Sequence, residues 1–195
     1  MNPGAIFLSR LEFVRFEVEV NRDYVNRSEN SVFPQLEFDF HNVTFDLGSN
    51  LDYPEEEVGD PRHFTLSLKL SIRQEKQSDG VVLPYSFNIE GVAYLHFRGS
   101  DEGLMRFKYV RGTGYPMLYS AFREQIANFT SRSEHGLWFL PSPTFTKMVD
   151  ENAPQDLLKW EAAKNSREDD MPPVGFKPKP APVKKKAAVR KSNSA

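Results

Sequence analysis

A strict alternation of apolar and polar residues constrains the fold of this chain more than any other feature of its sequence. From Phe64 to Ile72 every even-numbered residue is apolar and every odd-numbered residue is polar. Successive side chains of a β-strand point to opposite faces, so this run predicts a strand with one buried and one solvated face. The same period of two continues through residues 36–40 and 85–97 and predicts two more strands there.

A fourth strand is expected near the N-terminus, over residues 11–20. Its apolar residues change phase near Val14 and Arg15, which is the pattern that a β-bulge produces. Residues 77–80 predict a hairpin turn between the two strands that flank them. Residues 48–61 contain glycines, prolines and a run of glutamates, and they predict a long acidic loop.

The hydrophobic period changes in the second half of the chain, which predicts one long helix. This helix is expected over 115–132, with its single proline near the start. Gly112 and Gly114 predict a loop before it. A second, short helix is predicted over 151–165, with Pro154 in its first turn. The periodic apolar residues of the long helix are Tyr115, Leu118, Phe122, Ile126 and Phe129.

This order of elements indicates the α+β class, with a four-stranded antiparallel sheet packed with one long and one short helix. The 195 residues, 39% of them hydrophobic, are enough for one core. Such a sheet leaves edges uncovered, so we expect an oligomer, at least a dimer. We predict a folded unit over 1–150, the short helix over 151–165, and a disordered Pro/Lys-rich basic tail over 166–195.

The end of the chain differs from the remainder in charge. Residues 171–195 hold seven of the 25 bases and no acid, so 18 bases remain against 27 acids in the preceding residues. Two roles are open for the basic tail: contact with nucleic acid or anionic lipid, and solubility alone. Its clustered bases are Lys184, Lys185, Lys186, Arg190 and Lys191.

The sequence holds no residue constellation that indicates an enzyme or a metal site. It has no cysteine, which excludes disulfides and thiolate chemistry and suits the cytoplasm. No Gly-x-Ser-x-Gly elbow and no complete phosphate loop occur. No stretch of about 18 apolar residues predicts a membrane span. The histidines lack metal-ligand spacing and are expected to be structural or surface residues: His41, His63, His96 and His135.

The ordered set of elements, together with several residues, resembles the SecB family of protein-export chaperones. The resemblance covers about residues 8–150. It rests on the segment Phe33 to Phe40, which is similar to the family's aromatic and proline pattern before the second strand. It also rests on residues of the long helix and the segment after it: Leu118, Arg123, Glu124, Ile126, Ser131, Arg132, the run Trp138-Phe139-Leu140-Pro141, and Phe145.

The resemblance implies a cytoplasmic holdase without catalytic residues or cofactor. SecB-like proteins pair into dimers and often into tetramers, and they bind unfolded or precursor polypeptides in apolar grooves between sheet and helix, keeping them competent for export or folding. By this resemblance one set of residues becomes the candidates for the client groove or the subunit interface. These residues are Phe33, Phe38, Phe87, Ile89, Trp138, Phe139, Leu140 and Phe145.

The resemblance also suggests partners. Family members that dock on the SecA motor use acidic positions of the exposed sheet face. Glu19 matches one of these positions, whereas Arg15 and Asn88 stand where others are acidic. The long basic tail fits a member dedicated to a toxin–antitoxin pair as well as a solitary chaperone. The alternative class is a non-enzymatic oligomeric protein whose basic tail binds nucleic acid or anionic surfaces.

Overall fold

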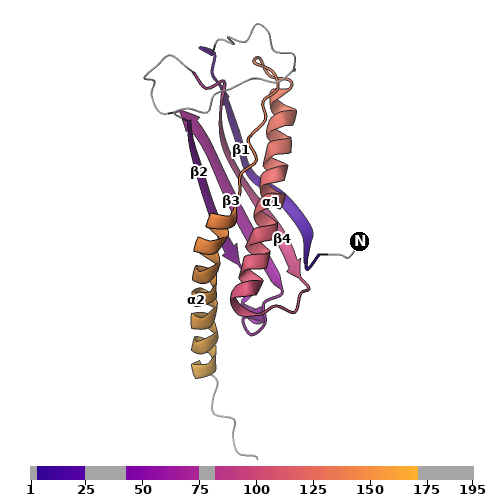
Figure 1. The fold of residues 1–195 in the computed structure, drawn as a ribbon, viewed down its shortest axis with the longest axis vertical. Coiled ribbons are helices and arrows are strands. Elements are labelled where there is room, and N and C mark those ends of the chain that lie inside the picture. Colours follow the sequence, from indigo (N-terminus) through magenta and orange to yellow (C-terminus); the bar gives the residue numbers. More distant parts are fainter. Residues whose placement is uncertain (1–3, 25–42, 75–81, 171–195) are drawn as a thin grey trace, which may run out of the picture.

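The structure is a computed structural model and describes residues 4–24, 43–74 and 82–170, with side chains up to residue 167. These residues form one four-stranded antiparallel sheet and two long helices (Figure 1), so the predicted α+β class is confirmed. In chain order the elements are β1 (Ile6–Val20), β2 (Val43–Asp52), the 3-10 helix η1 (Glu55–Glu57), β3 (His63–Gln74), β4 (Tyr85–Phe97), α1 (Gly103–Thr130) and α2 (Thr146–Asp170).

The sheet has the strand order β1-β4-β3-β2, which places β1 and β2 at its edges. The alternating run lies in β3, and its apolar residues from Phe64 to Ile72 are all buried. Leu66 of β3 pairs with Ala93 of β4, and both side chains lie in the core. Figure 1 shows α1 crossing one face of the sheet. One face of the sheet is therefore sealed by α1, as the alternation requires.

The phase change predicted in the first strand is confirmed as an irregularity of pairing. The register of β1 against β4 shifts between Phe13 and Arg15, and a second shift lies between Leu8 and Arg10. Because of the shift, Phe13 lies opposite Gly91 and Phe16 lies opposite Ile89, both on the side of β4 that faces α1. The bulge thus lets apolar residues of both phases reach the same face.

The second strand of the structure differs from the predicted one. The predicted strand over 36–40 and the predicted turn over 77–80 lie outside the described residues. The predicted loop over 48–61 is wrong in its first part, since β2 continues to Asp52. Gly48 sits within the strand, and its neighbours Leu47 and Leu51 both pack on the core. The Gly-Ser-Asn sequence is typical of a turn, but pairing with β3 keeps it extended.

The long helix begins well before the position that the sequence predicts. α1 spans Gly103–Thr130, so the loop predicted at Gly112 and Gly114 is wrong. A Cβ atom at Gly114 would lie 2.4 Å from the Cδ2 atom of Leu66 and 2.9 Å from the Cδ1 atom of Leu95. This glycine is therefore required for the close approach of α1 to the sheet and not for a turn.

The second helix is also longer than the sequence predicts. α2 spans Thr146–Asp170, whereas the prediction placed a short helix over 151–165. Pro154 lies inside α2 and not in its first turn. In Figure 1 the C-terminal end of α2 extends past the strands. α2 thus lies beside α1 and packs against it.

Replacing Gly114 by alanine should destabilise the fold by about 1–3 kcal/mol, because the added methyl group overpacks the contact with Leu66 and Leu95. Gly112 is the matched control, since a Cβ atom there has nothing within 4 Å. Gly112→Ala should leave the stability equal or raise it by up to about 1 kcal/mol through helix propensity. Urea unfolding of the two variants measures both values, and equal effects would contradict the close approach.

Candidate functional site

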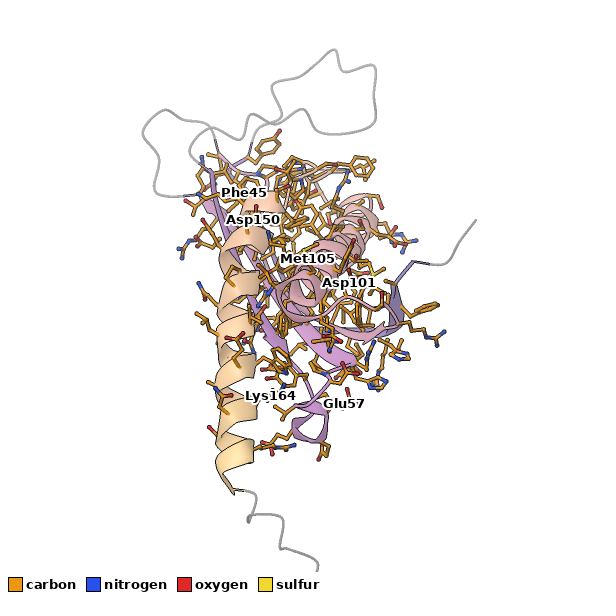
Figure 2. The ribbon with its side chains drawn as sticks, turned by 60° about the horizontal axis from the view of Figure 1, so that its bottom comes forward. Phe45, Glu57, Asp101, Met105, Asp150 and Lys164 are labelled. Atoms are coloured by element: carbon orange, nitrogen blue, oxygen red, sulfur yellow. The ribbon has the colours of Figure 1, made fainter. Side chains whose placement is uncertain are left out.

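A pocket of about 340 Å³ lies between the end of β2, the segment that follows it, and the C-terminal half of α2. We call it the α2 pocket. In Figure 2 the short helix that carries Glu57 and the part of α2 that carries Lys164 lie at the same end of the molecule. The pocket is lined by Leu51, Asp52, Tyr53, Glu55, Val58, Asp156, Lys159, Ala163 and Arg167.

The floor of the α2 pocket is apolar. Leu51 and Val58 are buried, and the half-buried ring of Tyr53 packs edge-on against Phe64 at 6.3 Å between ring centroids. Burial, with the nearby carboxylates of Asp156 and Asp52 as smaller causes, raises the pKa of Tyr53. Its hydroxyl therefore stays neutral near pH 7, and the floor presents an uncharged surface.

The walls of the α2 pocket carry opposite charges. Asp52 and Glu55 lie exposed on the side of β2 and η1, whereas Lys159 and Arg167 lie exposed on α2. Among the described residues no ion pair joins these side chains to one another or to other charges. The pocket thus combines an apolar floor with solvated charges at its rim, the usual composition of a recognition site.

The wall formed by α2 is held in place by a buried ion pair. The guanidinium of Arg111 on α1 donates two hydrogen bonds to the carboxylate of Asp156 on α2, one of them 2.8 Å long from Nη2 to Oδ1. The two side chains are only 3% and 5% exposed. Arg111 also donates to Ser49 Oγ on β2 at 3.0 Å, so one guanidinium connects both helices to the edge strand.

Further polar contacts extend this connection along α2. Ser49 Oγ and the hydroxyl of Tyr115 lie 2.7 Å apart, and Asn152 donates to the same hydroxyl at 3.3 Å. Trp160 Nε1 donates to the carbonyl oxygen of Val58 at 2.6 Å, directly at the pocket. The geometry of the pocket therefore depends on polar contacts as well as on packing.

The edge of β2 adds backbone groups to the site. β2 pairs with β3, and no other strand pairs with it in the part of the chain that the structure describes. An edge strand presents unpaired N–H and C=O groups that can bind an extended chain. Since Leu51 belongs both to β2 and to the pocket, a chain added along this edge would lead into the pocket.

A second apolar surface lies on the opposite edge of the sheet. Phe13 of β1 packs on Phe122 of α1 at 5.8 Å between ring centroids, and Phe16 packs on Phe129 at 6.0 Å. Phe13 and Phe129 are nevertheless 40% and 39% exposed. We call these four residues the β1/α1 aromatic group. Exposed aromatic rings beside an edge strand are typical of a contact surface.

The predicted contact residues occupy different positions. Phe87, Ile89, Trp138 and Leu140 are buried in the core of the single chain, and Trp138 stacks on Phe87 at 5.3 Å. Phe139 is 44% exposed. Phe145, at the edge of the core, packs on Tyr115 and Tyr119, and Glu19 is exposed on β1. Phe33, Phe38 and the basic residues Lys184, Lys185, Lys186, Arg190 and Lys191 lie outside the described residues.

The segment after α1 buries alternate members of its apolar run. Trp138 and Leu140 point into the core, and Phe139 between them is exposed. The hydroxyl of Tyr119 donates to the carbonyl oxygen of Pro141 at 2.9 Å, and burial raises the pKa of this tyrosine to about 12. The tyrosine therefore remains a donor at physiological pH and holds the segment extended against α1.

Sequence reasoning missed the α2 pocket, although a signal for it exists. Leu47 and Leu51 continue the period of two into the segment that was predicted as a loop, and Tyr53 follows in the same phase.

The described residues contain no cluster of three or more His, Asp or Glu side chains that could hold a metal ion. Within the same residues no helix has the length and hydropathy that a membrane crossing needs.

Comparison with known proteins finds similarity in structure but not in sequence. No protein-family model matches the chain, and no curated protein matches it. A solved SecB-like chaperone of Mycobacterium tuberculosis, in complex with a ChAD peptide from an antitoxin, is similar over 72% of this chain and 91% of its own, with 16% identity and a TM-score of 0.49. A protein of unknown function from Streptococcus agalactiae matches over 70% and 97%, with 10% identity and a TM-score of 0.38.

The resemblance to SecB-like proteins that the sequence suggested thus has a counterpart among solved structures. At these identities and TM-scores, neither structure transfers a function or a site to this chain.

Replacing Asp156 by asparagine should destabilise the protein by about 3–5 kcal/mol, since it leaves the buried guanidinium of Arg111 without its counter-charge. Asp150 on the same helix is the matched control, because its pair with Lys108 is exposed. Asp150→Asn should cost less than about 1 kcal/mol. Chemical denaturation followed by circular dichroism measures both, and a small effect of Asp156→Asn would show that the pair does not hold α2.

Proposed function

We propose that this protein is a SecB-like holdase chaperone that binds unfolded or precursor polypeptides and keeps them competent for export or folding. The observation that supports this most directly is the position of the α2 pocket. It places an apolar, partly open floor beside the edge of β2 that pairs with no other described strand. An extended polypeptide can bind both at once.

The two parts of the site suit a binder that does not select one sequence. Backbone groups of an edge strand pair with the backbone of a client, and backbone groups are the same in every sequence. The pocket, floored by Leu51, Tyr53 and Val58, accepts a large apolar side chain, and a non-native chain exposes many more of these than a folded one does. Selection for unfolded polypeptides then follows from exposure of backbone and apolar residues together.

The strength of such binding is modest at each site. Burying one large apolar side chain stabilises a complex by about 1.5–3 kcal/mol, from which the ordering of the client must be subtracted. Several pockets on one oligomer increase the affinity for a long unfolded chain and leave short or folded chains weakly bound. This combination lets a client be held and then released without an energy source.

The predicted residues take different parts in this proposal. Phe139 is a candidate client contact, because its ring is exposed next to the core. Phe33 and Phe38 remain candidates on the strength of the sequence. Phe87 and Trp138 fill the core behind the segment that presents Phe139, so their proposed part is to position it. Glu19, exposed on β1, remains the candidate for docking on a motor.

We further propose that two copies associate through the β1/α1 aromatic group. Phe13 and Phe129 are large, partly exposed rings that lie beside the outer edge of β1, with which no strand of the described sheet pairs. Burying them against a second copy would remove the edge and the aromatic surface from water together. The α2 pocket lies beside β2, at the opposite edge of the sheet, so association through β1 leaves the pocket open.

Replacing Phe13 by glutamate should reduce the oligomeric mass at micromolar concentration, because a charge would enter the proposed interface. Leu158→Glu is the control. Leu158 is exposed on α2 and lies outside the β1/α1 aromatic group, so its replacement should leave the mass unchanged. Sedimentation velocity measures the mass of both variants and of the parent. A parent protein that sediments as a monomer would remove the dimer proposal.

Replacing Ala163 by glutamate should weaken binding of an unfolded test protein about tenfold, equivalent to about 1.4 kcal/mol, because the new side chain fills the α2 pocket with a charge. Ala162→Glu is the matched control: Ala162 is exposed on the same helix turn and does not line the pocket. Alanine and glutamate are both good helix formers, so the circular dichroism spectra of the two variants should match that of the parent chain.

For the parent chain and both variants we measure how well each suppresses the aggregation of a denatured protein, and how tightly each binds that protein. A parent chain that fails to suppress aggregation, and whose salt-sensitive binding to nucleic acid is lost when residues 171–195 are deleted, would favour the alternative interaction protein. Equal loss of holdase activity in Ala163→Glu and Ala162→Glu would move the client site away from the α2 pocket.

A further inference from the structure

The α2 pocket lies next to the point where residues 171–195 leave the folded part of the chain. Three of its lining residues, Lys159, Ala163 and Arg167, belong to the last turns of α2, and the helix ends at Asp170. Pro172 and Pro173 follow after one residue, Met171, and disfavour a longer helix, since proline lacks the N–H group and clashes with the preceding turn. Residues 171–195 therefore begin close to the wall of the pocket that Arg167 forms.

The first residues after the helix match the floor of the pocket in chemistry. Phe176 is the only aromatic residue of 171–195, and Val174 is close to it. Phe176 is the sixth residue after Asp170, and a chain of this length spans up to about 20 Å, because an extended residue covers about 3.3–3.6 Å. Phe176 can therefore return to a pocket whose wall is made by the last turns of the preceding helix.

The charges on the β2 side of the pocket also match this segment. Lys177 and Lys179 follow Phe176 directly, and Asp52 and Glu55 are exposed at the rim on the β2 side. The third carboxylate that lines the pocket, Asp156, is buried and already paired with Arg111. The bases Lys159 and Arg167 line the α2 side of the pocket, so the acidic side is the one that favours the lysines.

We propose that residues 174–179 dock into the α2 pocket of the same chain, with Phe176 on the apolar floor and Lys177 and Lys179 on the side of Asp52 and Glu55. The inference rests on the proposed function, because the occupied pocket is the proposed client site. The segment acts as an internal competitor that resembles an unfolded client. Only a polypeptide that binds more strongly than the tethered segment then displaces it.

The tether makes this competition effective even if the segment binds weakly. A short connection gives the segment an effective concentration of about 1 mM at the pocket. If the free segment bound with a dissociation constant of about 0.1 mM, the tethered segment would weaken the apparent affinity for clients about tenfold. Removing the docking should therefore strengthen client binding by a factor of this order.

The first experiment is carbodiimide cross-linking of the full chain, followed by mass spectrometry. We expect links that join Lys177 or Lys179 to Asp52 or Glu55. A mixture of ¹⁵N-labelled and unlabelled protein separates links within one chain from links between chains. Phe176→Asp should reduce the yield of these links at least about fivefold. Val189→Asp, which also places a charge on an apolar tail residue but outside the docked segment, should leave the yield unchanged.

The second experiment measures the affinity of the same full-length variants for an unfolded test protein. Phe176→Asp should bind it about tenfold more tightly than the parent chain, and Val189→Asp should bind it as the parent does. Links that are lacking, that form only between chains, or that persist in Phe176→Asp would overturn the docking. Tighter binding by both variants would overturn it as well, because a general effect of negative charge would then suffice.

The cross-linking contains no client and so separates the two proposals. Links that depend on Phe176 in a protein without holdase activity would support the docking and remove only the proposed function. An active holdase without these links would retain the proposed function and remove the docking.

Discussion

The ion pair between Arg111 and Asp156 is the interaction on which the arrangement of the molecule depends. It joins the two helices in a buried environment, where each charge without the other would cost several kcal/mol. Through Ser49 the same guanidinium also holds the edge strand β2. Asp156 lines the α2 pocket, so the contact that fixes α2 also fixes one wall of the proposed binding site. Stability and site geometry therefore depend on the same two side chains.

The close contact of α1 with the sheet explains why a pocket forms at the edge. At Gly114 the helix has no side chain, and at Gly91 the strand has none, since a Cβ atom there would lie 2.6 Å from the ring of Phe122. These two glycines bring α1 close to β3 and β4. α2 then packs on α1 beyond the edge strand, and its last turns face β2 and η1 across the pocket. The result is a site made of one edge strand and one helix, open toward solvent.

The parts of the fold that the sequence predicted correctly are those with local periodicity. The alternation in β3 and β4 and the bulge in β1 could be predicted because one face of each strand is buried along most of its length. The first part of α1 was missed because Gly112 and Gly114 predict a loop, whereas Gly114 serves the close approach of the helix to the sheet. Arg106 adds a buried charge to the same part of the helix. Its guanidinium binds the carbonyl oxygens of Pro61 and Asp101, partners that no local pattern reveals.

The sequence by itself determined the class of the fold, the positions of β1, β3 and β4, and the contrast between an acidic body and a basic C-terminal segment, since periodicity and charge are local properties of the chain. Only the tertiary structure decided that Trp138 fills the core while Phe139 remains exposed, and that Leu51, Tyr53 and Ala163 face one pocket. The physical reason is that burial depends on which distant residues pack opposite a side chain, and a buried charge such as Arg111 is stable only beside a partner from another element.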